Sequence, residues 1–141
     1  MRRTVFGMTK FDDTLARMPI VPDQPLLDSS ALDRLRGFGG EKLLGGMIEL
    51  FVKNAPRKAA DAREALDCGD AAALRAALHA LKSSSGQLGA VSVHHACVAG
   101  EELASRGDLT ACAEHVERIE CDLPLACRQL DAVRLANPES H

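Results

Sequence analysis

The chain has 141 residues, enough for one domain with a sizeable hydrophobic core. Hydrophobic residues make up 46% of it but aromatic residues only 3%, so alanine and leucine supply most of the apolar surface and favour helices over strands. The balance of 17 basic against 20 acidic residues, with no basic stripe, gives little support to nucleic-acid binding.

The sequence indicates neither a membrane span nor a secretory signal. It has no run of about 18 apolar residues, and no apolar segment follows Arg2 and Arg3. The number of cysteines is odd, and several fall at core-like helical positions; they are Cys68, Cys97, Cys112, Cys121 and Cys127. We therefore expect reduced thiols, a cytoplasmic location and no contact between this domain and a membrane.

Residues 1–28 read as an N-terminal linker or extension, because Pro19, Pro22 and Pro25 interrupt them. At most a short helix fits within FDDTLARM. The helical pattern then occupies residues 29–136, and residues 137–141 form a C-terminal tail. The chain can be free-standing or the terminal part of a hybrid sensor kinase, and the sequence leaves this open.

Ser29 and Ser30 are N-cap candidates for a short helix, ALDRLRGF, which Gly39-Gly40 ends. A long helix is predicted from about residue 41 to 66, with Pro56 inside it as the expected point of a kink. Its apolar residues recur every three or four positions and so share one face. They are Leu44, Met47, Phe51, Ala55, Ala59, Ala62 and Leu66.

Two glycine–aspartate pairs, Gly69-Asp70 and Gly107-Asp108, each predict the end of one helix and the N-cap of the next. Between them we expect helices over about 71–87 and 91–105, separated at Gly89. The last helix has near-heptad apolar spacing through Leu109, Cys112, Val116, Ile119, Leu123, Ala126, Leu130 and Val133, with Pro124 as a point of bending. Together these elements predict an all-α, antiparallel up-down-up-down four-helix bundle with a short N-terminal helical extension.

His79 attracts attention because it lies off the buried stripe of its predicted helix. That stripe consists of Leu74, Leu78, Leu81, Ser85 and Leu88, and His79 lies about 140° from its centre on a helical wheel. The residues that share its outer face are small, namely Ala72, Ala76, Ser83 and Gly86, while Arg75 and Lys82 flank it. A partner could therefore approach the imidazole closely, with Lys82 one turn away. Geometry alone fits an ordinary solvated histidine equally well.

The stretch HALKSSSGQLGA, residues 79–90, resembles the motif of histidine-containing phosphotransfer (HPt) domains of two-component phosphorelays. The residues in register with that motif are His79, Leu81, Lys82, Ser84, Ser85, Gly89 and Ala90, and the surrounding helical pattern extends the resemblance over about residues 28–134. Ser83 departs from it, because the family usually has glycine there. A serine adds a Cβ and a hydroxyl that hydrogen-bonds the ring or narrows the approach to it.

The resemblance implies a phosphocarrier and not a self-sufficient enzyme. His79 would accept a phosphoryl group from a receiver-domain aspartate and pass it to another receiver, and Lys82 would offset the charge on the phosphoryl oxygens. The receiver-docking face would comprise Arg75, Ala76, Ser83, Gly86 and Gln87. No metal or cofactor of its own is implied, since Mg²⁺ would come with the receiver. The implied partners are response-regulator receivers and a hybrid sensor kinase in the same or another chain, with a monomer as the default.

Three other hypotheses remain. Zinc binding would use His94, His95 and Cys97, or Cys112 and His115, and serine hydrolysis would use Ser83, Ser84 or Ser85. An HPt-like adaptor would bind a signalling partner or enzyme through the same face, with or without phosphotransfer. The acidic residues Asp61, Glu64, Glu101, Glu102, Glu114, Glu117 and Glu120 are expected to form solvated faces without chemistry.

Overall fold

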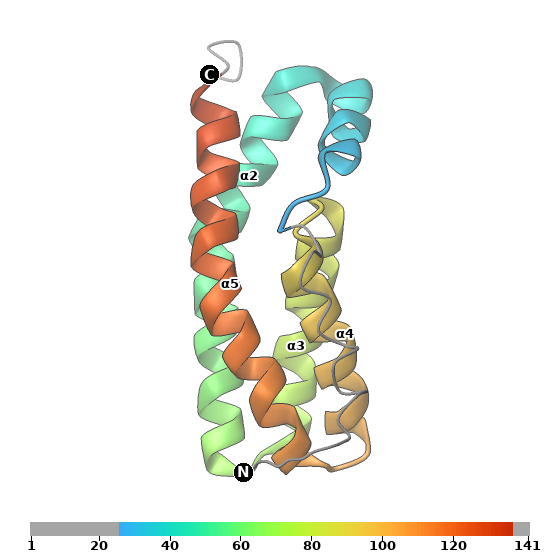
Figure 1. Ribbon diagram of the computed structural model, residues 1–141, viewed down its shortest axis with the longest axis vertical. Helices are drawn as coiled ribbons and strands as arrows, with labels where there is room; N and C mark the ends of the chain where they lie inside the picture. The colour runs from blue at the N-terminus through green and yellow to red at the C-terminus, as the bar shows by residue number, and fades with distance from the viewer. Residues whose placement is uncertain (1–25, 137–141) are drawn as a thin grey trace, which may run out of the picture.

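The computed structural model describes residues 26–136. The short helix predicted within FDDTLARM and the C-terminal tail lie outside these residues. The described chain forms four helices: α2 (Ser29–Cys68), α3 (Ala71–Gln87), α4 (Val91–Ser105) and α5 (Leu109–Leu135). They run alternately in opposite directions, as Figure 1 shows, and no strand occurs among residues 26–136. The predicted all-α, up-down-up-down bundle is therefore confirmed.

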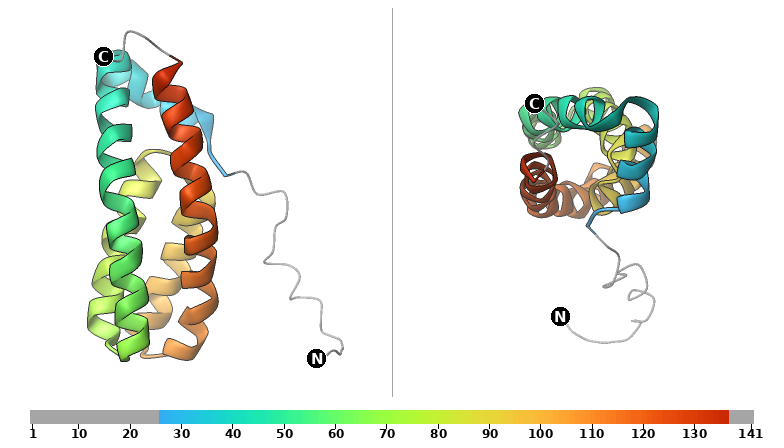
Figure 2. Two further views of the ribbon diagram at one scale, coloured as in Figure 1. Left: turned by 90° about the vertical axis from the view of Figure 1, so that its left-hand side faces the viewer. Right: turned by 90° about the horizontal axis from the view of Figure 1, so that it is seen from above.

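Each helix packs against two neighbours around a closed ring: α2 contacts α3 and α5, and α4 contacts the same two helices. The helices differ in length, because α2 and α5 have 40 and 27 residues whereas α3 and α4 have 17 and 15. The longer pair therefore extends beyond the α3–α4 hairpin (Figures 1 and 2), and the first turns of α2 lie across that end of the bundle.

Gly40 explains the shape of α2. Its φ of 74° and ψ of −168° are non-helical, so two helical segments meet at this residue. Glycine adopts such a left-handed φ without the steric penalty of a side chain. The end predicted for the short helix is thus found where expected. The helix continues through Pro56, where a kink was expected, and the backbone dihedrals inside α2 depart from helical values at Gly40 instead.

The caps follow the predicted pattern, with one correction. Asp70 and Asp108 accept hydrogen bonds from Ala73 N and Ala111 N, and a glycine with positive φ precedes each aspartate. At the start of α2, however, the N-cap is Asp28, which accepts from the Ser30 N–H, and not Ser29 or Ser30. A carboxylate accepts this bond more strongly than a hydroxyl.

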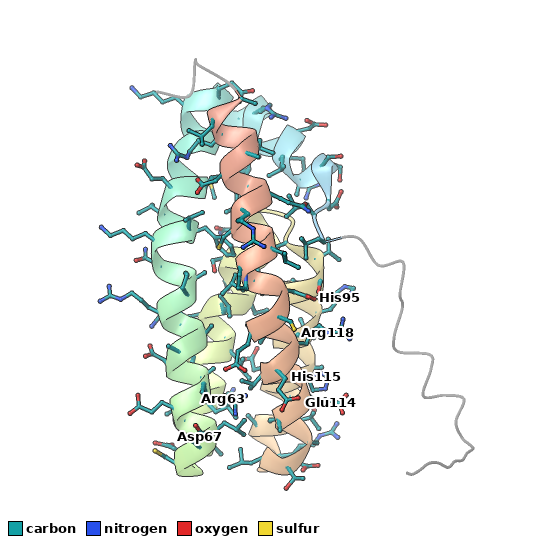
Figure 3. All side chains as sticks on the ribbon, turned by 60° about the vertical axis from the view of Figure 1, so that its left-hand side comes forward. Arg63, Asp67, His95, Glu114, His115 and Arg118 are labelled. Atoms are coloured by element: carbon teal, nitrogen blue, oxygen red, sulfur yellow. The ribbon has the colours of Figure 1, made fainter. Side chains whose placement is uncertain are left out.

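The core consists mainly of alanine, leucine and other aliphatic side chains. The predicted stripe of α3 is completely buried, and on α2 and α5 most predicted core positions are buried as well. Met47, Leu66, Leu103, Leu109 and Val133 are only partly buried and pack against the rim of this core. Charged side chains project outward from the long helices, for example Glu114 and Arg118 (Figure 3).

The segment before α2 fixes the end of the helix that carries His79. Asp28 N donates to Gly89 O at 2.7 Å, and Val91 N donates to Leu26 O at 3.1 Å. A Cβ on Gly89 would come within 2.7 Å of Asp28 O, so this turn between α3 and α4 needs glycine for space as well as for its φ of 69°. The α3–α4 hairpin is therefore held from outside at its turn.

Candidate functional site

His79 lies on the outer surface of α3, as predicted. Its side chain is 63% exposed, whereas its neighbours Leu78 and Leu81 are fully buried. Ala76 and Ser83, one turn before and after it, are exposed small residues. The imidazole is therefore not a core residue, and little side-chain bulk surrounds it on α3.

Glu101 of α4 is the residue that organises this site. Its Oε2 lies 2.8 Å from His79 Nδ1, and its Oε1 lies 2.7 Å from Lys82 Nζ. The expectation that Glu101 belongs to a solvated face is wrong, because its side chain is only 14% exposed. The other six acidic residues of that expectation are exposed: Asp61, Glu64, Glu102, Glu114, Glu117 and Glu120.

Gly100 is the one residue of the sequence that indicates this contact, and it does so indirectly. Gly100 packs against Leu78, with so little room that a Cβ would come within 2.9 Å of Leu78 Cδ1. At this close approach of α3 and α4, the residue that follows Leu78 is His79, and the residue that follows Gly100 is Glu101. A helical wheel of α3 alone cannot show the pair, because the two residues are 22 positions apart on different helices.

The carboxylate of Glu101 is held in its ionised form. Burial by itself raises the pKa of Glu101, but the hydrogen bonds and positive charges of Lys82 and His79 outweigh burial and lower it overall. An ionised carboxylate only accepts hydrogen bonds. The proton between the two groups therefore sits on Nδ1, and in the neutral ring the lone pair is on Nε2, the nitrogen farther from Glu101.

The other residues expected on the docking face divide into two groups. Arg75, Ala76, Ser83 and Gln87 are exposed on α3. Gly86 is partly covered, because a Cβ there would come within 3.0 Å of the His94 ring of α4. The same ring places Nδ1 3.0 Å from the carbonyl oxygen of Lys82. Packing between α3 and α4 thus accounts for the glycine at position 86.

Comparison with known proteins places this chain in a family. The family model described as Hpt domain matches residues 46–134, more than half of the chain. The chain belongs to the Hpt domain family. Hpt proteins are phosphotransfer carriers of phosphorelays and not conventional enzymes, and they work with response-regulator receivers and kinases.

Solved structures agree with this assignment. The Hpt domain is similar to histidine-containing phosphotransfer protein B (HptB) from Pseudomonas aeruginosa PAO1, with 27% identity and a TM-score of 0.75, covering 81% of this chain and 98% of that one. It shares its fold with a putative histidine-containing phosphotransfer protein from rice, with 18% identity and a TM-score of 0.66, over 86% of this chain and 91% of that one. No curated protein gave a significant match.

The zinc hypothesis finds no support in the described part of the Hpt domain, where no three His, Cys, Asp or Glu side chains form a group able to hold a metal ion. Cys97 and Cys112 are fully buried. Burial, with a smaller effect from Glu101, raises the pKa of Cys97 to about 12, and burial also raises that of Cys112. Both thiols thus remain protonated and pack as small apolar groups.

The serine run serves the helix itself at two of its three positions. Ser85 is buried and donates to Leu81 O at 2.7 Å, and Ser84 lies 3.3 Å from the same oxygen. Among the hydrogen bonds found in residues 26–136, none involves the Ser83 hydroxyl, which is exposed. Ser84 and Ser85 are therefore helix-bonded groups and not nucleophiles oriented by a base.

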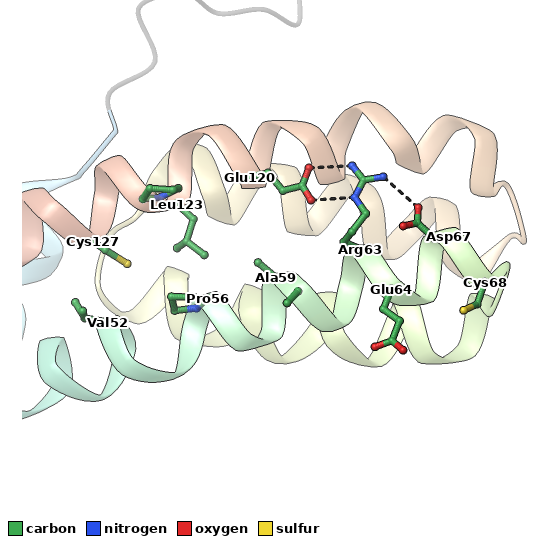
Figure 4. A pocket seen from close by; sticks show the side chains of 12 residues that line it. Val52, Pro56, Ala59, Arg63, Glu64, Asp67, Cys68, Glu120, Leu123 and Cys127 are labelled. Atoms are coloured by element: carbon green, nitrogen blue, oxygen red, sulfur yellow. Dashed lines mark hydrogen bonds and ion pairs between the residues drawn. The ribbon is translucent and has the colours of Figure 1, made fainter.

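A separate apolar groove of about 760 Å³ lies between α2 and α5, with Pro56, Ala59, Leu123 and Cys127 among its lining residues. Figure 4 shows that Arg63 spans it to reach Glu120, with two contacts of 2.9 Å. None of the residues around His79 lines this groove. None of the helices in the described residues combines the length and apolar character that a membrane span needs.

Proposed function

We propose that His79 is the phosphoryl acceptor of this Hpt domain, receiving the group from a receiver-domain aspartyl phosphate and passing it to a second receiver. The proposal is carried by the two contacts of the Glu101 carboxylate, one with Nδ1 of the exposed His79 ring and one with Lys82 Nζ. The first favours the proton on Nδ1, and the second holds Lys82 beside the ring. A nucleophilic histidine needs an unprotonated ring nitrogen that a partner can reach. With the proton of the neutral ring on Nδ1, that nitrogen is Nε2, and the side chain that carries it is exposed.

In the proposed step, the Nε2 lone pair attacks the phosphorus while the bond to the aspartyl oxygen breaks and its electron pair leaves with the carboxylate. Lys82 can move toward the phosphoryl oxygens, because it lies one helical turn from His79 and its Nζ contacts the same carboxylate as the ring. Catalytic acidic residues and Mg²⁺ would belong to the receiver.

The docking face we propose comprises Arg75, Ala76, Ser83 and Gln87, with Gly86 at its margin under His94. These residues surround His79 on α3, and all but the arginine and the glutamine are small. A receiver must bring its aspartate within bonding distance of Nε2, so bulky side chains here would block transfer. A cytoplasmic location and action as a monomer are part of the same proposal.

The experiment is phosphotransfer from radiolabelled receivers to the full chain, followed by acid and base treatment. We expect label that is acid-labile, base-stable and absent from His79→Gln. His95→Gln is the matched control, because that histidine is exposed on α4 and is not one of the docking-face residues, so labelling should stay intact. Absence of label across a broad panel of receivers would overturn the proposal and favour an adaptor that binds through the same face.

A further inference from the structure

The Nδ1 proton of His79 has a second consequence once phosphotransfer at Nε2, as proposed above, is accepted. When Nε2 bonds to phosphorus, the ring carries a proton on one nitrogen and a phosphoryl group on the other, and is therefore a cation. On transfer to the next receiver, the N–P bond breaks and its electron pair returns to the ring. A protonated ring leaves as neutral imidazole, whereas a deprotonated ring would have to leave as an anion, which is far less favourable.

The charges around the ring decide whether it keeps that proton. Glu101 faces Nδ1 at 2.8 Å from α4. On α3 itself, Lys82 and Arg75 flank the ring with positive charge, which opposes retention of the proton. On the α2 side, Lys58 borders a hollow lined by Ala80 and Ser84. Lys58, Asp61 and Glu64 border a second hollow, which Ala76 of α3 also lines, and no contact joins either carboxylate to the ring among the described residues. Glu101 is thus the negative charge in contact with the ring.

We propose that Glu101 retains the Nδ1 proton of His79 after phosphorylation, so that the phosphohistidine stays a protonated, transfer-competent donor at neutral pH. No proton is gained or lost over the two transfers, because the same proton remains on Nδ1 throughout. The 14% exposure of the Glu101 side chain limits screening of its charge by water. Lys82 shares the carboxylate at 2.7 Å in the resting state and can turn to the phosphoryl oxygens when they arrive.

Glu101 acts here through His79 and is a positioning residue. The readout must therefore be one that loss of structure alone would not move. The full chain is phosphorylated with phosphoramidate, a chemical donor that needs no receiver, and the ring of the phosphohistidine is titrated by ¹⁵N and ³¹P NMR. Signals of the other four histidines are assigned from the His79→Gln variant.

We expect the phosphohistidine ring of the wild type to keep its proton to a pH roughly one unit or more higher than in Glu101→Gln, since an opposite charge in contact shifts a pKa by about that much. Glu101→Asp, which keeps the charge, should recover part of the shift. Glu102→Gln is the matched control, because Glu102 is the next residue on α4 but pairs with Arg106. As the pH is raised, the rate of transfer to any competent receiver should begin to fall at a lower pH in Glu101→Gln than in the wild type.

Equal titration of the wild type and Glu101→Gln would overturn the inference. If Glu101→Gln is poorly folded, Glu101→Asp replaces it. The ring of Glu101→Asp should lose its proton at a lower pH than the ring of Glu102→Gln, and equal titration of these two variants would overturn the inference. The inference and the proposed function fail in different ways. Receivers that never label His79 would end the function but leave the titration measurable, whereas an unmoved titration with normal receiver labelling would end only the role of Glu101.

Discussion

Gly100 of α4 lies against Leu78 of α3, so closely that a Cβ on the glycine would come within 2.9 Å of Leu78 Cδ1. Leu78 is fully buried and cannot turn toward solvent to relieve such a contact. The close approach of the two helices brings Glu101 to His79, the residues that follow this pair in sequence. The contact between Glu101 and His79 at the surface therefore depends on the absence of a side chain at Gly100 in the core.

Gly100→Ala should destabilise the bundle and slow phosphotransfer. Overpacking a core commonly removes about 1–3 kcal/mol of stability, which equals or exceeds the gain of roughly 1 kcal/mol from a better helix former. Gly46→Ala is the control, because a Cβ there meets nothing within 4 Å. It should stabilise the fold by about 0.5–1 kcal/mol and leave transfer unchanged. Urea denaturation measures the stability of each variant, and labelled transfer measures its rate. Equal stability of Gly100→Ala and Gly46→Ala would contradict the expectation.

Glu101→Gln should also change how stability depends on pH. The folded state lowers the pKa of Glu101, through Lys82 and His79 against the opposing effect of burial. A lowered pKa contributes stability above the pKa of the unfolded chain, and this stability is lost as the pH falls through the folded value. The unfolding free energy of the wild type should exceed that of the variant by about 1 kcal/mol at pH 7, and the two should converge as the pH falls below the folded pKa of Glu101.

Denaturant unfolding of the wild type and Glu101→Gln across this pH range tests the point. Glu102→Gln should run parallel to the wild type throughout, because the pair it breaks with Arg106 is exposed. A constant difference between wild type and Glu101→Gln from pH 7 to below the folded pKa of Glu101 would mean that the charge of Glu101 does not contribute to folding.

The sequence predicted the fold of the described residues closely, because each element carries its own local signals. Apolar spacing gave the buried stripes, and Gly69-Asp70 and Gly107-Asp108 gave the turns. The two wrong predictions concern the N-cap of α2 and the effect of Pro56 on that helix. Asp28 caps α2 ahead of Ser29, and α2 accommodates Pro56 without a break in its helical dihedrals.

The site was predicted only as far as one helix can show it. The wheel of α3 placed His79 outside and Lys82 beside it, and the structure has both there. Glu101 was assigned to solvent because its partners are on another helix, and the pairing of α3 with α4 is set by Gly100 and Leu78 in the core. Gly86, expected on the docking face, is explained in part by the His94 ring above it.

The ion pair between Arg63 and Glu120 offers a test of whether the α2–α5 groove takes part in phosphotransfer. Two contacts of 2.9 Å join these side chains, but both are more than one-third exposed. We expect Glu120→Gln to lower the unfolding free energy by about 0.5–1 kcal/mol, less at high salt, because exposed pairs are weak and screened. Transfer rates should stay at the wild-type value. A rate that falls while stability holds would assign the groove a role in receiver docking.

Ser83→Gly should speed transfer. Ser83 is exposed one turn after His79, and none of the hydrogen bonds found in residues 26–136 involves its hydroxyl. Removing the Cβ and hydroxyl clears the surface over which the receiver must approach Nε2, so we expect a rise of a few-fold in the rate despite a stability loss of about 0.5–1 kcal/mol. Ser83→Ala removes the hydroxyl alone and separates the two contributions.

Rapid-quench transfer from a labelled receiver gives the rates, and denaturant unfolding gives the stabilities. Ala132→Gly, on the exposed side of α5, introduces the same kind of helix destabilisation away from the site and should not change the rate. If Ser83→Ala and Ser83→Gly both match the wild type, the receiver does not contact this turn of α3. If both are slower, the hydroxyl contributes a hydrogen bond to the transfer complex, and Ser83 assists the reaction that its bulk was expected to hinder.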